Sequence, residues 1–515
     1  MHIDARQLGN NSTIEGDICI IGAGAAGLSI ALEWLNTPYK VILLEGGGFE
    51  YDDKVQDLLR GKETGQKYYP LKSTRLHLFG GSTGHWGGMC STFDPIAFQK
   101  RDWVPLSGWP ITQEELMPFY KRSANCLELP DTEFDCNVWT KKDSTLVPLP
   151  FQKYFWNKVW RFSKPTRFGS RYKDTMVNAS NIHLYTYANA TEIHTNENVS
   201  SVSGVTIKNY AGKTHKVIAK HYILACCAIQ NARLLLASNK QAPGGLGNDN
   251  DLVGRHFMEH CEIHAGELWL NDANALKLYM YKPPRAKAEL AVKAEKQAEF
   301  QILNGITSFS PLDLDKKIPP LSKSWSTDDP RENWKDISDA DVKARGNKIK
   351  RFFESKEHQS WELVVRLEQA PNPNSRIYLD KELDTLGVPR PILHWELGDF
   401  EKRTLRKIIE LIGKEAGLSG IGRVKLDKNL WDEKNIEFPE NTSGGWHHMG
   451  TTRMDNDPKR GVTDGNGKIH GINNLYTTGS SNFTTGGGVN PTMTLIALSI
   501  RLSDHVKDKL KKGTV

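Results

Sequence analysis

The stretch DICIIGAGAAGLSIALEWL, near the start of the chain, limits the possible folds more than any other part of the sequence. An apolar run, Ile18 to Ile21, leads into Gly22, Gly24 and Gly27, and residues that favour a helix follow with helical spacing. The first glycine of such a stretch permits a tight turn, the second lets backbone approach a pyrophosphate, and the third lets the helix pack on the strand. We therefore predict a strand, a turn and a helix whose N-terminus binds a dinucleotide.

A second apolar run, KVILLEGGG, supports this prediction because it leads to Glu45. A carboxylate at the end of that strand can accept hydrogen bonds from both ribose hydroxyls of an adenosine, and it repels a 2′-phosphate. FAD and NAD both satisfy the pattern, whereas NADP is disfavoured. The alternative is a glycine turn in an unrelated strand-helix-strand unit. The sequence has no second glycine fingerprint after a strand, which argues against a flavin reductase with separate FAD and NADPH sites.

Length, charge and cysteine content narrow the function further. The 515 residues are enough for about two to four domains and for a large ligand bound between them. The formal net charge of +6 is spread along the sequence rather than gathered in one basic run, which argues against a nucleic-acid partner. The seven cysteines show no paired CxxC spacing, so we expect reduced thiols and no metal.

The N-terminal stretch MHIDARQLGNNSTIEGD lacks the basic start and the apolar core of a secretory signal. The sequence also has no window of about 18 apolar residues that could span a membrane. We therefore expect a cytoplasmic protein without a membrane span.

Local patterns predict several further elements. SGWPITQEELMPFYKRSANCLEL predicts a helix that begins with a capping box of Thr112 and Glu115. Residues 181–227 alternate as strands with a turn at Ala211–Gly212, and AIQNARLLLAS follows as a short helix. We interpret the lysines of PPRAKAELAVKAEKQAEF as the solvated face of a helix, and residues near 310–345 as a polar loop. A last helix is predicted for NPTMTLIALSIRLSDHVKDKL.

Several stretches, in the same order along the chain, resemble the glucose-methanol-choline (GMC) oxidoreductases. They are GAGAAG with Glu45, FGGSTGHWGG, GWPI with ELMPFY, ILACCAIQNARLLLAS, LVGRHFMEH, EQAPNPNSRIYLD, HHMGTTRM and NNLYTTGSSNFTTGGGVNPTMT. These stretches cover most of the chain except about 265–355. Within the family, the chain looks closest to pyranose 2-oxidases and related bacterial sugar or glycoside oxidoreductases. It departs from the family at Cys226 and Cys227, where small glycine or alanine residues are usual, and cysteine is small enough to fit.

The resemblance implies an α/β fold with two domains. One is a Rossmann-like FAD-binding domain that is discontinuous in sequence, and the other is a substrate-binding domain of a sheet and helices. We expect the FAD-binding domain to comprise 1–180, with a loop and helix insert at about 50–140, together with 181–261 and 441–515. The substrate-binding domain would then comprise 262–440. Its poorly matched part would hold the substrate loop and any subunit contacts.

The resemblance also implies the oxidation of an alcohol by hydride transfer to flavin, which needs a group that takes the hydroxyl proton. Histidine suits this role, because its ordinary pKa of about 6.5 leaves it largely neutral at pH 7. In the family the base stands three residues before a glycine, so Gly450 selects His447 rather than His448 as the catalytic base. His448 is then expected to support the site, either packing under the flavin or binding backbone.

The second catalytic position in the family corresponds to Asn490. Its amide can donate a hydrogen bond to the substrate oxygen and accept one from the substrate hydroxyl, so it orients the alcohol without competing for the proton. The simpler alternative is that Asn490, which precedes Pro491, only caps the last helix. Both roles are compatible, and the N-terminus of that helix would then face the flavin.

His85 and Trp86 match the position at which pyranose 2-oxidases carry a histidine joined covalently to the flavin. Because Gly84 replaces the usual threonine here, we leave two readings open: a covalent bond through His85, or packing of its ring on the flavin. Neighbouring glycines would let backbone approach a planar ring. The full set of expected FAD contacts is Gly22, Gly24, Gly27, Glu45, Gly81, Ser82, His85, Trp86, Gly479, Asn490, Pro491 and Thr492.

The predicted reaction is oxidation of a secondary hydroxyl of a pyranose sugar or glycoside to a ketone, with oxygen, a quinone or a cytochrome as acceptor. One alternative is the catalytic subunit of a sugar dehydrogenase, whose small partner subunit would carry the export signal and place it in the periplasm. Others are an enzyme for a non-sugar alcohol, a hydroxynitrile lyase that keeps FAD without net redox chemistry, and an NAD-dependent dehydrogenase. A homo-oligomer is also compatible with the resemblance.

Overall fold

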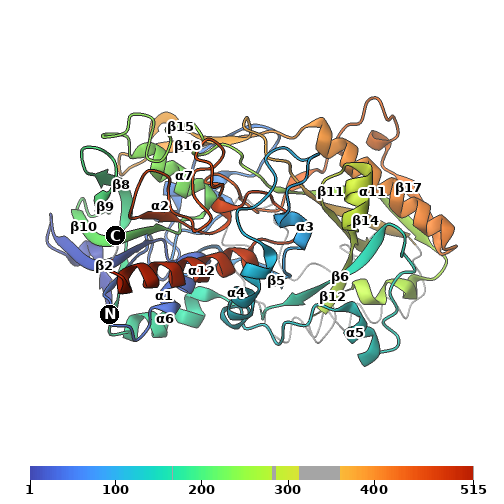
Figure 1. Cartoon of the computed structure of the whole chain (residues 1–515), viewed down its shortest axis with the longest axis horizontal. Helices are drawn as coiled ribbons and strands as arrows, with labels where there is room; N and C mark the ends of the chain where they lie inside the picture. The colour runs from blue at the N-terminus through green and yellow to red at the C-terminus, as the bar shows by residue number, and fades with distance from the viewer. Residues whose placement is uncertain (165, 281–285, 312–359, 514–515) are drawn as a thin grey trace.

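The computed structural model describes residues 1–164, 166–280, 286–311 and 360–513. Two large sheets lie next to each other along the long axis of the molecule, and both termini are at the end formed by the first sheet (Figure 1). We call the first sheet A and the second sheet C. The first is mostly parallel and the second antiparallel, so the α/β fold class predicted from the sequence is confirmed.

In the part of the chain that the structure describes, sheet A has eight strands in the order β1-β7-β3-β2-β10-β9-β8, with β19 paired to β10. The strands are β1 (His2–Asp4), β2 (Thr13–Ile21), β3 (Val41–Leu44), β7 (Ile182–Thr186), β8 (Asn189–Thr195), β9 (Val202–Lys208), β10 (Thr214–Leu224) and β19 (Leu475–Thr477). Strands β1, β7, β3, β2 and β10 are parallel, whereas β8, β9 and β10 form the antiparallel meander that the alternation predicted. Gly212, with φ of +73°, lies in the turn between β9 and β10.

The predicted glycine turn joins β2 to α1 (Ala25–Glu33). Gly22 has φ of +104°, a left-handed conformation that glycine adopts without strain. A Cβ atom on Gly27 would lie only 1.8 Å from the Gly22 carbonyl oxygen, so this glycine allows the helix to approach the strand. The predicted strand, turn and helix are therefore confirmed.

Several helices pack around sheet A. They include α4 (Gln113–Cys126), α6 (Phe168–Asn178), α7 (Cys227–Ala237) and α12 (Thr492–Lys511). The capping box of Thr112 and Glu115 is present at the start of α4, as predicted. Helix α12 packs against α1 and α4, and its N-terminal end points to the middle of the molecule (Figure 1).

Within the described residues, sheet C has eight strands in the order β17-β11-β14-β13-β12-β6-β5, with β18 paired to β11. They are β5 (Met89–Cys90), β6 (Phe155–Phe162), β11 (His260–Leu270), β12 (Ala286–Val292), β13 (Gly305–Pro311), β14 (Ser360–Glu368), β17 (Gly422–Leu426) and β18 (Ser443–Gly444). Strands β5 and β6 precede residue 180, so this sheet also receives strands from the N-terminal part of the chain. Helix α11 (Asp399–Leu418) packs against β11 and β17.

The interpretation of PPRAKAELAVKAEKQAEF as a helix face is wrong for its first half. Residues Ala286–Val292 form β12, and only Ala294–Phe300 form a helix, α8. Strand β12 pairs with both β6 and β13, and these long-range hydrogen bonds override the helix propensity of an alanine-rich stretch. The polar loop expected near 310–345 falls almost entirely outside the described residues.

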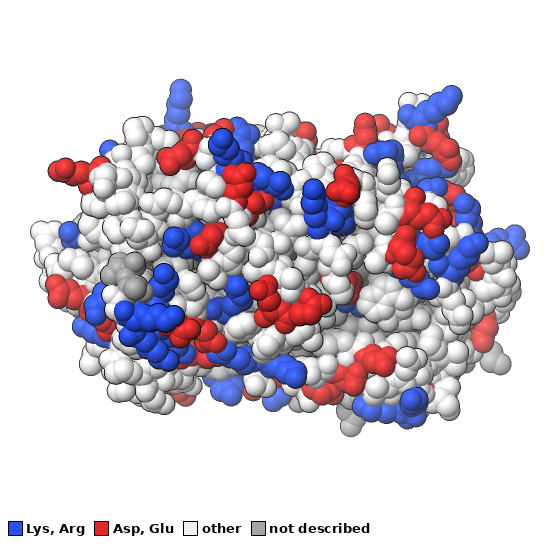
Figure 2. All heavy atoms as spheres, in the orientation of Figure 1, with Lys and Arg blue, Asp and Glu red and all other residues white. Residues whose placement is uncertain are grey.

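A small sheet completes the fold: β4 (Lys62–Gly65), β15 (Arg376–Leu383) and β16 (Pro389–Trp395). On the face shown in Figure 2, acidic and basic side chains are interspersed over the surface. Within the ranges given above, none of the helices combines the length and apolar character needed to cross a bilayer.

Candidate functional site

A cavity of about 650 Å³ lies between the two sheets and brings together almost all of the predicted site residues. Its wall includes the β2–α1 turn, the end of β3, the loop around residues 81–89, the stretch 443–448 and the N-terminal end of α12. Both His447 and His448 line it. The predicted cofactor contacts that line it are Gly22, Gly24, Glu45, Gly81, Ser82, His85, Trp86, Gly479, Asn490, Pro491 and Thr492. Gly27 is the exception, since it packs beneath the turn.

The N-terminus of α1 has the form of a phosphate site. Its N-cap is Gly24, which has no side chain, so the cap residue offers no side-chain acceptor to the first N–H groups of the helix. The atom nearest to a Cβ on Gly24 would be Gly81 Cα at 3.9 Å, so the backbone here is open to the cavity. These features fit the pyrophosphate of FAD.

Glu45 follows β3 and is 5% exposed. Its carboxylate accepts hydrogen bonds from the N–H groups of Ala23 at 3.1 Å and Gly47 at 2.9 Å, which fixes its position beside the glycine turn. Burial raises the pKa of this carboxyl group, and the backbone hydrogen bonds oppose the rise. The position suits binding of ribose hydroxyls.

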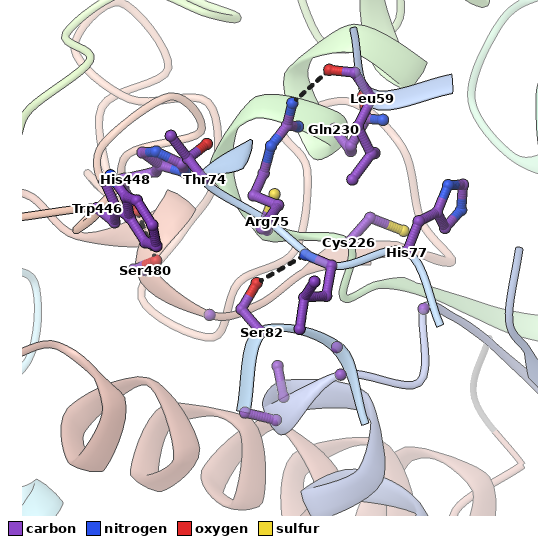
Figure 3. A pocket seen from close by; sticks show the side chains of 18 of the residues that line it. Leu59, Thr74, Arg75, His77, Ser82, Cys226, Gln230, Trp446, His448 and Ser480 are labelled. Carbon is purple, nitrogen blue, oxygen red and sulfur yellow. Dashed lines mark hydrogen bonds between the residues drawn. The ribbon is translucent and has the colours of Figure 1, made fainter. Parts of the chain in front are cut away.

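Figure 3 shows part of the cavity wall. Ser82 Oγ accepts a hydrogen bond from Leu76 N–H at 3.3 Å, and Arg75 donates to the Leu59 carbonyl at 2.9 Å. Trp446 and His448 also line the cavity.

The loop histidine, His85, packs against the Trp446 ring with centroids 5.2 Å apart, and burial lowers its pKa to about 3. Its neighbour Trp86 donates its indole N–H to the Thr166 carbonyl at 3.0 Å. A neutral His85 ring is compatible with either reading of its role.

The two predicted catalytic residues are in contact. His447 Nε2 lies 3.1 Å from Asn490 Nδ2, although the residues come from different segments. The N-cap of α12 is Pro491, and Asn490 makes no capping hydrogen bond to this helix, so the simpler reading of Asn490 as a side-chain cap is wrong. Asn490 Oδ1 is buried and has no hydrogen-bond partner among the described residues.

Sequence reasoning missed two residues that contact His447, namely Glu259 at its backbone N–H and His260 at its Nδ1. His260 Nδ1 lies 3.0 Å from His447 Nδ1, and its Nε2 lies 2.9 Å from the carbonyl oxygens of both Gly486 and Gly487. The Glu259 carboxylate accepts the N–H of His447 at 2.9 Å. The only signal was the FMEH end of LVGRHFMEH, in which the acid comes just before β11 and the histidine begins it.

His448 takes a different direction from His447. Its Nε2 lies 3.0 Å from the Tyr68 hydroxyl, and its ring packs against Phe257 with centroids 5.8 Å apart. Ser480 Oγ donates to the His448 carbonyl at 2.7 Å. The side chain therefore contacts Tyr68 rather than backbone.

Burial sets the protonation of these groups. It lowers the pKa of His447 well below the ordinary value, and His260, Arg366 and His448 lower it further. Burial also lowers the pKa of His260 to about 4 and raises that of Glu259 to about 7. Both histidines are therefore neutral at pH 7, as a proton acceptor must be.

The wall near His447 that belongs to sheet C is polar. Glu262 on β11 lies directly across from Arg366 on β14, and both line the cavity. Arg366 also donates to Glu289 on β12 at 3.1 Å, and Lys287 pairs with Glu289 at 2.7 Å, so the positive charges of Arg366 and Lys287 balance those of the two glutamates. Donors and acceptors are thus held close to the histidine–asparagine pair.

The chain is similar to known oxidoreductases over most of its length. A family model described as GMC oxidoreductase matches residues 371–499. The chain is 25% identical to 2-methyl-1,2-propanediol dehydrogenase of Mycolicibacterium austroafricanum, over 96% of both chains. It is 21% identical to the fructose dehydrogenase large subunit of Gluconobacter japonicus, over 98% of this chain and 100% of that one.

The likeness to pyranose 2-oxidase of Tricholoma matsutake is only partial, at 26% identity over 27% of this chain and 23% of the other. Among solved structures, pyridoxine 4-oxidase from Mesorbium loti shares the fold, with a TM-score of 0.59 at 17% identity over 96% of this chain and 99% of that one. The family match over residues 371–499 and the relatives that are similar over almost the whole chain support an oxidoreductase of the GMC type that acts on the CH–OH group of its donor.

Proposed function

We propose that this enzyme oxidises a secondary hydroxyl of a carbohydrate, either a pyranose sugar or a glycoside, to a ketone. The observation that carries the proposal is the contact of His447 Nε2 with Asn490 Nδ2 at 3.1 Å in a cavity whose nearby wall is polar. FAD, when bound, supplies the acceptor for the hydride that leaves the carbinol carbon.

Different residues of the chain would bind different parts of FAD. The first N–H groups of α1 would hold the pyrophosphate, and Glu45 would bind the adenosine ribose. The glycine-rich loop of Gly81 and Ser82 and the start of α12 would contact the flavin end. His85 would either pack on the flavin or bond to it, and a covalent bond would leave the flavin attached to denatured protein.

His447 and Asn490 have separate tasks toward the substrate. The Nε2 lone pair of His447 takes the hydroxyl proton, which a neutral imidazole can do at pH 7. The amide of Asn490 holds the same oxygen and keeps the C–H bond aligned. His448 supports the site through Tyr68.

A polyhydroxylated substrate suits the cavity wall. Glu262 and Arg366 offer acceptors and donors side by side, and their charges are balanced, so the wall favours hydroxyl groups over a net charge. Fructose dehydrogenase and pyranose 2-oxidase carry carbohydrate substrates in their names. A non-sugar alcohol is the second candidate, because the propanediol dehydrogenase is similar over almost the whole chain.

Oxygen, a quinone or a cytochrome would then take the electrons, and an enzyme of this kind could act alone, as a homo-oligomer or with a small partner subunit. We propose a cytoplasmic location, with co-export to the periplasm as the alternative if a partner subunit exists.

Anaerobic mixing of the FAD-loaded enzyme with single substrates tests the proposal. We expect a pyranose or glycoside to bleach the flavin absorbance band, and the His447→Gln variant with the same FAD content to bleach at least a hundredfold more slowly. Bleaching by 1,2-diols alone would overturn the carbohydrate assignment. Admission of air then separates an oxidase, in which colour returns promptly, from a dehydrogenase that needs a quinone or cytochrome.

A further inference from the structure

We propose that His260 is a positioning residue that fixes the tautomer of His447, so that the Nε2 lone pair of His447 faces the substrate. Glu259 fixes the backbone of the turn that contains His447. This inference rests on the proposed function only for its effect on rate. The tautomer itself is a property of the protein and can be tested separately.

The glycine loop before α12 determines which nitrogen of His260 carries a proton. His260 Nε2 lies 2.9 Å from two carbonyl oxygens, those of Gly486 and Gly487. Carbonyl oxygens only accept hydrogen bonds, so Nε2 must carry a proton. His260 is fully buried and, with its lowered pKa, neutral, so its second nitrogen, Nδ1, carries none.

The next link is the contact between the two rings. His260 Nδ1 and His447 Nδ1 are 3.0 Å apart, and the rings meet nearly edge to face at 80°. One proton must lie between these nitrogens, and His260 Nδ1 has none to give. His447 Nδ1 therefore carries the proton and donates it to His260.

The last link faces the cavity. With its proton on Nδ1, a neutral His447 has an unprotonated Nε2, which accepts a hydrogen bond from Asn490 Nδ2 at 3.1 Å. The opposite tautomer would set two lone pairs against each other at His260 and two donors against each other at Asn490. The contacts with His260 and with Asn490 favour the same tautomer. The unprotonated Nε2 of His447 therefore faces the cavity before substrate binds.

Glu259 holds the turn in which His447 lies. Its carboxylate accepts the N–H groups of Gly445 at 3.2 Å, His447 at 2.9 Å and His260 at 3.0 Å, and it also accepts the hydroxyl of Tyr68. Between Gly445 and His447, Trp446 has φ of +58°, a left-handed conformation that a bulky residue rarely adopts. The hydrogen bonds from the Gly445 and His447 N–H groups, on either side of Trp446, to one buried carboxylate maintain this strained turn.

The ionisable groups around His447 and His260 leave both rings neutral. Arg366 and His448 act on His447 in the direction that keeps it neutral. Around His260, Arg366 acts in the same direction, and Glu368 acts weakly in the opposite one. Both rings are therefore neutral, and their hydrogen-bond partners decide which nitrogen carries the proton.

Imidazole-¹⁵N NMR of histidine-labelled holoenzyme, with His447 assigned by the His447→Gln variant, tests the tautomer directly. We expect His447 to appear with a protonated Nδ1 and an unprotonated Nε2 in the native enzyme. In His260→Leu we expect this preference to weaken. A His447 ring protonated at Nε2 in the native enzyme would overturn the proposal, whether or not any alcohol is oxidised.

The rate measurement uses the same variants. His260→Leu should slow anaerobic flavin bleaching by about a hundredfold with FAD content unchanged, as expected when a general base is misaligned. His260→Asn, whose amide oxygen can accept from His447 Nδ1, should recover at least tenfold of this loss. The matched control is His264→Leu on the same strand, which does not line the cavity and should keep the native rate. Equal loss in the leucine and asparagine variants would show a merely structural role.

Discussion

Asn490, one residue before the N-cap of α12, contacts His447 in the turn that follows β18, with 3.1 Å between Asn490 Nδ2 and His447 Nε2. The contact joins the N-terminal end of α12 to the turn that follows β18 of sheet C. It also leaves Asn490 Oδ1 buried and without a partner among the described residues.

Replacing Asn490 should therefore affect chemistry more than cofactor binding. We expect Asn490→Ala to lower the limiting rate of anaerobic flavin reduction by about 10- to 100-fold, because the alcohol loses one orienting partner. Asn490→Asp should be worse and should move the acidic limb of the pH profile upward, since a carboxylate stabilises a protonated His447. Stopped-flow reduction across pH 5–9 measures both effects. An unchanged pH profile in Asn490→Asp would contradict the contact.

Kinetics should distinguish the roles of the two adjacent histidines, His447 and His448. His447→Gln should slow flavin reduction by about 10²- to 10⁴-fold, the usual range for loss of a general base, while the flavin spectrum stays intact. His448→Gln, which keeps a hydrogen-bonding group near Tyr68, should cost less than tenfold. A larger loss from His448→Gln than from His447→Gln would exchange their roles.

Local patterns predicted the glycine turn, the capping box at Thr112 and helix α7, because each depends on residues close in sequence. Strand β12 was missed because its identity depends on partners in β6 and β13 that the sequence does not place beside it. His260 was missed for the same reason, since its contact with His447 spans 187 positions in the sequence.

The glycine turn permits a test of cofactor binding that is independent of catalysis. A Cβ on Gly24 would enter open space with the nearest atom at 3.9 Å, whereas one on Gly27 would meet the Gly22 carbonyl oxygen at 1.8 Å. We expect Gly24→Ala to leave the melting temperature of the apoprotein within a few degrees of native and to reduce FAD content. Gly27→Ala should lower apoprotein stability as well. Full FAD occupancy in Gly24→Ala would argue against a pyrophosphate at this turn.

His256 allows a prediction about acid stability away from the proposed chemistry. It is 3% exposed, has φ of +59°, and burial with nearby Arg453 and Arg255 lowers its pKa to about 3. A histidine whose folded pKa lies below its unfolded value of about 6.5 stabilises the fold fully above pH 6.5, and this stability is lost as pH falls toward the folded pKa. The loss is about 1.4 kcal/mol per pH unit for one such group.

Asparagine tolerates the left-handed conformation of His256 and does not titrate in this range. We therefore expect His256→Asn to lose less stability than the native protein between pH 6.5 and pH 4, by about 3 kcal/mol at the lower end. Denaturant unfolding of both proteins at a series of pH values measures the difference. The rate of flavin reduction at pH 7.5 serves as the control, and we expect it to stay native, because His256 does not line the cavity. Parallel pH dependences of the two proteins would show that His256 is already protonated or solvated in the fold.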